Sequence, residues 1–267
     1  MGYSNWSTDA FDHLRTERKT KTREQIFSST SIKKDMNPKG VAFREARDSE
    51  AHPNSVPVFF AFDVTGSMDE IPVQFAKNLL GKLMDKIIQS GTPDPQILFG
   101  AIGDHISDQS PFQIGQFESG HVELDKWLTT IFLEKEGGPW GEESYSLAWL
   151  FAARHTKLDS FEKRGQKGYL ITAGDERVHD TIDAANMKRI FGGQGEDLTA
   201  KELLVEAQQL YHVYHIHIEH SNGARSESVI RPWRELLGQN LIVLDDYNKI
   251  ADTVTSIIKA NKNLLTQ

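Results

Sequence analysis

The feature that most constrains the fold is an apolar run from Val56 to Phe62 that ends abruptly at Asp63. The run contains no charge and is rich in valine and phenylalanine, which indicates a strand buried on both faces, as in the middle of a parallel sheet. Asp63 then lies at the carboxyl end of a central strand, which is where open α/β sheets bind their ligands. The sequence therefore predicts a functional site at Asp63.

Three oxygen-bearing side chains alternate along the segment that begins at this strand end, namely Asp63, Thr65 and Ser67. Residues two apart in an extended loop tip turn to the same side, and Gly66 lets the backbone turn tightly between them. One carboxylate and two hydroxyls suit a hard divalent cation, Mg²⁺ before Ca²⁺, with Mn²⁺ as an alternative, whereas zinc prefers nitrogen and sulfur ligands. We therefore expect an Mg²⁺ site.

Strands and helices alternate along the rest of the chain. Pro72 at an early helical position and apolar residues at helical spacing predict a helix from about 71 to 89. The next two strands are close enough in sequence to form a hairpin, and later strands are separated by helical patterns. We therefore expect an α/β fold with a doubly wound, Rossmann-like, mostly parallel six-stranded sheet and one antiparallel hairpin strand. The predicted strands are 56–62, 96–104, 112–117, 167–176, 210–218 and 241–244.

The segment Asp63-Val64-Thr65-Gly66-Ser67-Met68 resembles the metal-ion-dependent adhesion site (MIDAS) of von Willebrand factor A (vWA) domains, which reads D-x-[ST]-G-S and is often followed by Met. The resemblance covers about residues 55–262 and is to the intracellular bacterial and bacteriophage members of the D-x-T-G-S-M type. It implies a vWA fold and a non-catalytic protein-protein interaction module. In such a module, a Glu or Asp of a partner protein completes the coordination of the Mg²⁺ ion.

Two further loops donate ligands in that family, and both depart from the family pattern in this chain. Where relatives carry a Thr in the second loop, this chain has Glu142, Glu143 and Ser144, of which we take Glu143 and Ser144 as ligands. In the third loop, Ala173 takes the place of the usual acid. We expect Asp175 to replace it, because a shift of two residues along an extended segment preserves the side that faces the site.

Other interpretations of these acids remain open. Asp63 or Ser67 could serve only as a helix N-cap. The same Asp-x-Thr-Gly-Ser segment also resembles phosphoryl-transfer enzymes of the haloacid dehalogenase type, in which Asp63 would be a covalent nucleophile. That alternative requires a lysine near the acids, with Lys163 or Lys167 as the candidates.

Several additional residues have weaker claims to a site. Asp104 ends a predicted strand as Asp63 does, and it is either close to the site or a loop cap, while His179 follows the third loop. His215, His217 and Glu219 share one face of a predicted strand at a spacing that zinc enzymes use. Buried, hydrogen-bonded histidines explain that spacing more simply.

The composition limits the classes of partner. The chain has 30 Lys and Arg against 38 Asp and Glu, which gives no electrostatic reason to expect nucleic acid or an anionic membrane as a partner. It has no cysteine, no apolar stretch long enough to span a membrane and no signal sequence at its start. We therefore expect a cytoplasmic protein and leave its oligomeric state open.

Residues 1–52 lack sustained helical or strand periodicity, yet they contain more aromatic residues than disordered segments usually carry. We expect an N-terminal extension over 1–52, a partly ordered arm that packs on the domain or on a partner. A vWA-like domain is expected over 53–267.

Overall fold

The computed structural model describes residues 4–68, 70–134, 141–219 and 227–265 of the 267-residue chain. Its centre is a six-stranded sheet with the order β12-β11-β7-β2-β3-β4, in which neighbouring strands are parallel except for the antiparallel pair β3 and β4. The predicted doubly wound, mostly parallel sheet with one antiparallel hairpin strand is confirmed. Its strands are β2 (Val56–Asp63), β3 (Pro95–Ile102), β4 (Phe112–Ile114), β7 (Gly168–Gly174), β11 (Tyr211–Ile218) and β12 (Leu241–Leu244).

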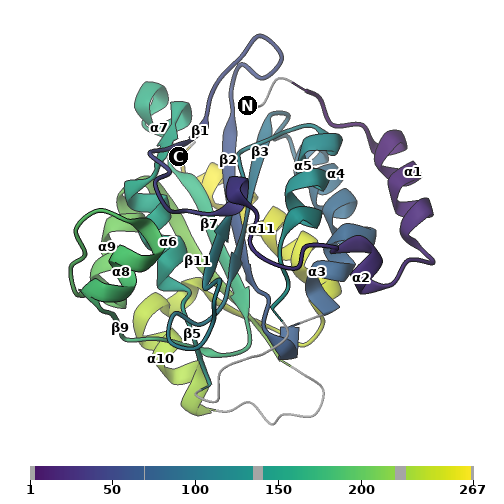
Figure 1. The fold of residues 1–267 in the computed structure, drawn as a ribbon. Helices are drawn as coiled ribbons and strands as arrows, with labels where there is room; N and C mark the ends of the chain where they lie inside the picture. The colour runs from purple at the N-terminus through teal and green to yellow at the C-terminus, as the bar shows by residue number, and fades with distance from the viewer. Residues whose placement is uncertain (1–3, 69, 135–140, 220–226, 266–267) are drawn as a thin grey trace.

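Helices cover both faces of this sheet (Figure 1). One face carries α1 (Thr8–Arg18), α2 (Arg23–Ile26), α3 (Glu70–Gln74), a π-helical segment (Phe75–Leu79), α4 (Leu80–Gln89), α5 (His121–Thr130) and α11 (Ile250–Leu265). The other face carries α6 (Ser146–Arg154), α7 (Asp159–Arg164), α8 (Ala184–Phe191), α9 (Ala200–Leu210) and α10 (Glu227–Leu237). Within the described residues, three short strand pairs lie outside the sheet: β1 (Arg44–Ala46) with β6 (Thr156–Leu158), β5 (Glu142–Glu143) with β8 (Arg177–Val178), and β9 (Thr181–Ile182) with β10 (Leu198–Thr199).

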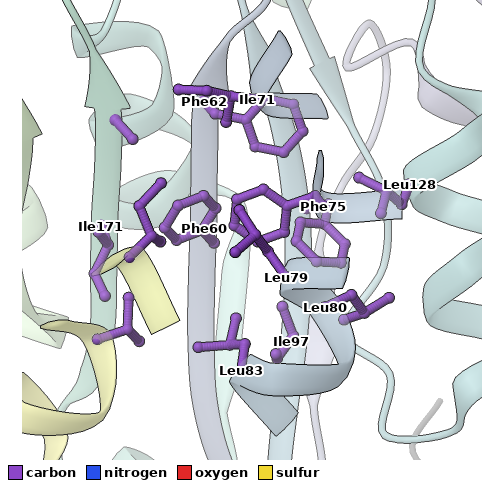
Figure 2. Packing of buried hydrophobic residues seen from close by; sticks show 14 of the residues in the cluster. Phe60, Phe62, Ile71, Phe75, Leu79, Leu80, Leu83, Ile97, Leu128 and Ile171 are labelled. Atoms are coloured by element: carbon purple, nitrogen blue, oxygen red, sulfur yellow. The ribbon is translucent and has the colours of Figure 1, made fainter. Parts of the chain in front are cut away.

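Strand β2 is central because its side chains are apolar on both faces. Phe60 and Phe62 point to the face covered by the helix after the site, where they pack with Phe75 (Figure 2). Phe59 and Ala61 belong to the core on the opposite face, under α6. Successive side chains of a strand alternate between faces, so Asp63 continues the side of Phe59 and Ala61. The carboxyl group of Asp63 therefore faces α6.

The helix predicted from about 71 to 89 is present as the continuous run of α3, the π-helical segment and α4. Its inward side chains, including Leu79 and Leu83, are fully buried against the sheet. Pro72 lies in the first turn of α3, where the missing N–H of proline removes no helical hydrogen bond. This helix therefore fixes the far end of the loop that begins after Asp63.

The described part of the N-terminal extension packs on the domain. Phe11 of α1 is 1% exposed and packs so closely on Gly81 of α4 that a methyl group at Gly81 would lie 2.7 Å from its ring. Arg18 forms a two-pronged ion pair with Asp125 of α5. Farther along, β1 pairs in parallel with β6 at the edge of the other helical layer. The extension thus crosses from one helical layer to the other.

Among the described residues, no helix is both long and apolar enough to cross a lipid bilayer.

Candidate metal centre

Asp63 is fully buried at the end of β2, and neutral groups hold both of its oxygens. Oδ1 accepts hydrogen bonds from the Thr65 backbone N–H at 2.8 Å and from the Thr65 hydroxyl at 2.7 Å. Oδ2 accepts one from the Tyr145 hydroxyl at 3.1 Å. The chain then makes a short 3₁₀ turn over Gly66–Met68, which contains Ser67. The side chain of Ser67 lies outside the described part of the structure.

Glu143 supplies a second buried carboxyl group next to Thr65. It lies on β5, is 4% exposed, and its Oε2 atom has no hydrogen-bond partner among the described residues. The Thr65 hydroxyl lies within hydrogen-bonding contact of both carboxyl groups. A hydroxyl has one proton to donate, so Thr65 can donate to only one of two ionised carboxylates. When both acids are ionised, this pocket therefore holds more acceptor oxygens than donors.

The electrostatics of the pocket reflect this excess of acid. Burial, followed by repulsion from Asp63, raises the pKa of Glu143 to about 10. Burial, followed by repulsion from Asp175, raises the pKa of Asp63 to about 7. Burial and the same three carboxyl groups also raise the pKa of Tyr145 well above its usual value. A positive charge placed among these groups would oppose each of these shifts, because it favours the ionised form of the acids and of Tyr145.

Asp175 lies near Asp63, but not for the reason inferred from the sequence, which was that a shift of two residues keeps a side chain on the same side of an extended segment. Ala173 pairs in register with Phe62, and both belong to the core on the face opposite to Asp63. A shift of two residues along the strand would therefore leave Asp175 on the wrong face. Strand β7 instead ends at Gly174, and Asp175 lies in the turn beyond it. The direction of the chain after the strand places this carboxylate near Asp63, and the alternation of side chains along the strand does not.

The three candidates of the second loop separate onto two sides of a short extended segment. Glu143 lies beside Asp63 and Thr65, whereas Glu142 pairs with Arg177 at 3.1 Å. The Ser144 hydroxyl accepts a hydrogen bond from the backbone N–H of His105 at 2.7 Å and contacts the ring Nδ1 of the same residue at 2.7 Å. Alternation along an extended chain explains the separation. Of the residues expected to replace the family Thr, Glu143 is the one beside Thr65. The preceding residues Gly137 to Trp140 lie outside the described part of the structure.

A second polar cluster lies on the Ser144 side and contains Asp104, His105 and His179, all buried. His179 Nε2 is 2.8 Å from Asp104 Oδ1, and the two imidazole rings make an edge contact with centroids 4.5 Å apart. Ser144 Oγ and Asp104 Oδ1 both approach Nδ1 of His105, at 2.7 and 4.0 Å. A charge-relay triad needs the serine and the acid on opposite ring nitrogens, so this cluster does not have that geometry.

The two lysines that the phosphoryl-transfer alternative requires both have partners away from Asp63. Lys163 pairs with Asp159 at 2.7 Å, and Lys167 binds the backbone carbonyl of Gln208 at 2.6 Å. Both lysines precede β7 and so lie at the amino end of the sheet, across the length of a strand from Asp63. Neither lysine is placed to assist a nucleophile at Asp63.

Among the histidines of β11, His215 packs in the protein interior. His215 is fully buried, its Nδ1 lies 2.9 Å from the Thr172 hydroxyl, and its ring stacks on Trp233 with centroids 3.6 Å apart. Burial, followed by the neighbouring His217, lowers the pKa of His215 well below its usual value. A neutral stacked ring is therefore expected at this position.

Tyr145 is the residue of the pocket that the sequence did not reveal. It immediately precedes α6, is fully buried, and reaches Asp63 across the space above Gly174. A Cβ atom at Gly174 would lie 1.9 Å from the Tyr145 hydroxyl oxygen, so only glycine fits there. The two residues are far apart in sequence, and their complementarity becomes visible only in three dimensions.

A scan against protein-family models finds no match, and no curated protein matches the chain. Among solved structures, the chain is similar to the pilus adhesin SpaC from Lactobacillus rhamnosus GG in its open conformation, with a TM-score of 0.51, 8% identity and coverage of 86% of this chain and 33% of the adhesin. Proximal thread matrix protein 1 from the mussel byssus, in a structure with a zinc-occupied MIDAS motif, gives a TM-score of 0.48 and 11% identity over 77% of this chain and 46% of that one.

This chain thus spans about a third of the adhesin's length. At such low identity, the similarity to the adhesin concerns the fold alone. The TM-score of the mussel protein is too low to add to it. What the strand order and the two helical layers establish is an α/β architecture consistent with a Rossmann-like vWA fold.

Proposed function

We propose that this protein is a metal-dependent protein-interaction module whose cation lies between Asp63, Thr65 and Glu143. The main support for this proposal is the buried carboxyl group of Glu143, which lies beside a second buried acid. Its Oε2 atom has no hydrogen-bond partner within the described residues. Burying an ionised carboxylate with one oxygen unpaired is unfavourable. A divalent cation at this point would satisfy both acids at once.

The donor set favours a hard cation such as Mg²⁺. Asp63, Thr65 and Glu143 offer only oxygen, and Ser67 and Asp175 would add further oxygens directly or through water. Ser144 would reach the cation only by leaving its two contacts with His105. Mg²⁺ takes about six oxygen ligands and readily retains water where the protein provides none. At least one exchangeable position therefore belongs to the proposal.

The open coordination position defines the class of partner. Asp63, Glu143 and Asp175 carry three negative charges when all are ionised, one more than a divalent cation neutralises. With one of these acids protonated the centre has no net charge, so a further carboxylate would be held by direct coordination in place of water and not by excess positive charge. We propose that a Glu or Asp of another protein supplies that ligand. Because the carboxylate replaces water at the cation, binding should depend on the metal.

Phosphoryl transfer is the less favoured alternative. A covalent nucleophile needs an oxygen that is free to attack, whereas Asp63 is fully buried and hydrogen-bonded at both oxygens. Lys163 and Lys167 are engaged at the other end of the sheet. These observations support a binding role without catalysis.

A pull-down from cell extract with and without chelator tests the proposal. Intact protein should capture a partner in Mg²⁺ and lose it in chelator, and Asp63→Ala should not capture it in either condition. Asp180→Ala is a matched control, because Asp180 is an exposed acid in the loop after β8 and should behave as the intact protein does. Equal capture by intact protein in Mg²⁺ and in chelator would show that recognition uses another surface.

A further inference from the structure

The buried cluster of Asp104, His105 and His179 has a chemistry that the oxygen-lined pocket lacks. It brings two imidazole rings and one carboxylate together, with one potential ligand atom of each within 4.8 Å of the others. All three residues are at most 5% exposed. Imidazole nitrogen with carboxylate oxygen is the donor set of zinc and related transition-metal dications, not of Mg²⁺. We propose that these three residues form a second metal site, which takes a dication of the zinc class.

The spacing of the ligand atoms is close to what such an ion requires. With metal–ligand bonds of about 2.0–2.1 Å, the ligand atoms of a tetrahedral site are about 3.3 Å apart. Asp104 Oδ1 is 2.8 Å from His179 Nε2 and 4.0 Å from His105 Nδ1, one distance shorter and the other longer than that value. Equalising them requires side-chain movements on the order of 1 Å, in which His105 Nδ1 leaves its 2.7 Å contact with the Ser144 hydroxyl.

Outer contacts already orient the proposed ligands. His179 presents Nε2 to Asp104 while its Nδ1 lies 3.2 Å from Glu142 Oε2, the carboxylate–histidine arrangement that commonly supports a metal ligand. Asp104 is held by the backbone N–H of Ile106 at 2.9 Å and by the Ser107 hydroxyl at 2.8 Å. His105 Nδ1 contacts the Ser144 hydroxyl at 2.7 Å, so an ion bound through that nitrogen would replace this contact.

The second site would be separate from the first and would support it mechanically. Glu142 and Ser144 contact the histidines of the cluster, while Glu143 between them turns to Asp63. An ion at Asp104 would therefore tie the loop after β3 to the residues after β8 and hold the extended segment that presents Glu143. This site does not require the function proposed for Asp63, and its test can succeed where that proposal fails.

The test uses untagged full-length protein with excess Mg²⁺, to which Zn²⁺ is added. We expect one equivalent of bound Zn²⁺ by calorimetry and imidazole scattering in its X-ray absorption spectrum. Co²⁺ should give a strong visible absorption, because a tetrahedral ion lacks the inversion centre that makes these bands weak in octahedral oxygen sites. An oxygen-only absorption spectrum or the absence of Zn²⁺ binding would overturn the proposal, and neither readout depends on a variant.

Variants then assign the site. His105→Gln and His179→Gln should each weaken Zn²⁺ binding at least roughly tenfold. Asp63→Asn should bind Zn²⁺ as the intact protein does, and so should His13→Gln, which alters an exposed histidine on α1. Zn²⁺ affinity that is unchanged in both cluster variants would overturn the proposal, as would a loss confined to Asp63→Asn. Circular dichroism without metal checks that each variant is folded before its affinity is compared.

Discussion

Replacing Glu143 by Gln should stabilise the metal-free protein, which is the opposite of what a buried polar substitution usually does. In the unfolded chain, a glutamate has a pKa of about 4.3 and is ionised at pH 7. In the folded protein, the pKa of Glu143 is raised to about 10, so this carboxyl group must take up a proton when the chain folds at pH 7. That uptake makes folding less favourable.

The size of the effect follows from the separation between the unfolded pKa and the pH. Each pKa unit corresponds to about 1.4 kcal/mol, so protonating Glu143 at pH 7, about 2.7 units above its unfolded pKa, costs up to about 4 kcal/mol. Glutamine has nearly the same shape, is neutral in both states and avoids this cost. For a domain of this size, the gain corresponds to a rise in melting temperature of roughly 8–15 °C. The gain should shrink towards pH 4, where the unfolded glutamate is protonated as well.

Thermal unfolding in chelator, followed by circular dichroism at pH 7 and at about pH 4.5, measures this effect. Glu142→Gln is the matched control, because it changes the adjacent acid on the other side of β5 and should bring no gain. At an Mg²⁺ concentration tenfold above Kd, the stability difference between the two proteins should narrow by up to about 1.4 kcal/mol, because the intact protein gains that amount and the variant lacks one ligand. A Glu143→Gln protein less stable than the intact protein in chelator at pH 7 would refute the reasoning.

Three further results are expected. First, the pKa of Asp63 is raised to about 7, so metal-free protein should become more stable as pH falls from about 7 towards 4. The stabilisation by Mg²⁺ should fade over the same range, because protons compete with the ion for the carboxylate. Thermal unfolding with and without chelator at several pH values checks both trends. Second, Gly174→Ala should displace Tyr145, lower stability by about 1–3 kcal/mol and reduce the Mg²⁺ response, and an unaltered melting curve would contradict the packing. Third, Arg18→Ala should leave Asp125 mostly buried without its ion pair, cost about 2–3 kcal/mol and speed proteolysis within α1, whereas unchanged cleavage would show that α1 is held without it.

The fold was predictable because its signals are local. Val56 to Phe62 is apolar on both faces, which is sufficient to place it at the centre of a sheet, and the alternation of strands with helical patterns then gives the doubly wound topology. Asp63 followed directly, because it is the first charge beyond that strand. Both inferences depend on neighbouring residues alone.

The rest of the pocket was harder to predict from the sequence, because it depends on how separate loops meet. Glu142, Glu143 and Ser144 are adjacent in sequence, and only the direction of β5 shows which of them faces Asp63. Asp175 was identified as a candidate for a reason that the register of β7 contradicts. The cluster of Asp104, His105 and His179 draws on loops 75 residues apart in sequence, a proximity that no spacing rule encodes.

Water-proton relaxation of Mn²⁺-loaded protein tests the central claim most directly, because Mn²⁺ takes the same oxygen ligands as Mg²⁺ and its relaxivity reports exchangeable water on the ion. Intact protein should bind Mn²⁺ with enhanced relaxivity, a Glu-containing peptide or free carboxylate should reduce that relaxivity, and Asp63→Asn should abolish the binding. Mn²⁺ bound without exchangeable water, or bound equally well by Asp63→Asn, would contradict an open oxygen-lined metal centre at the end of β2.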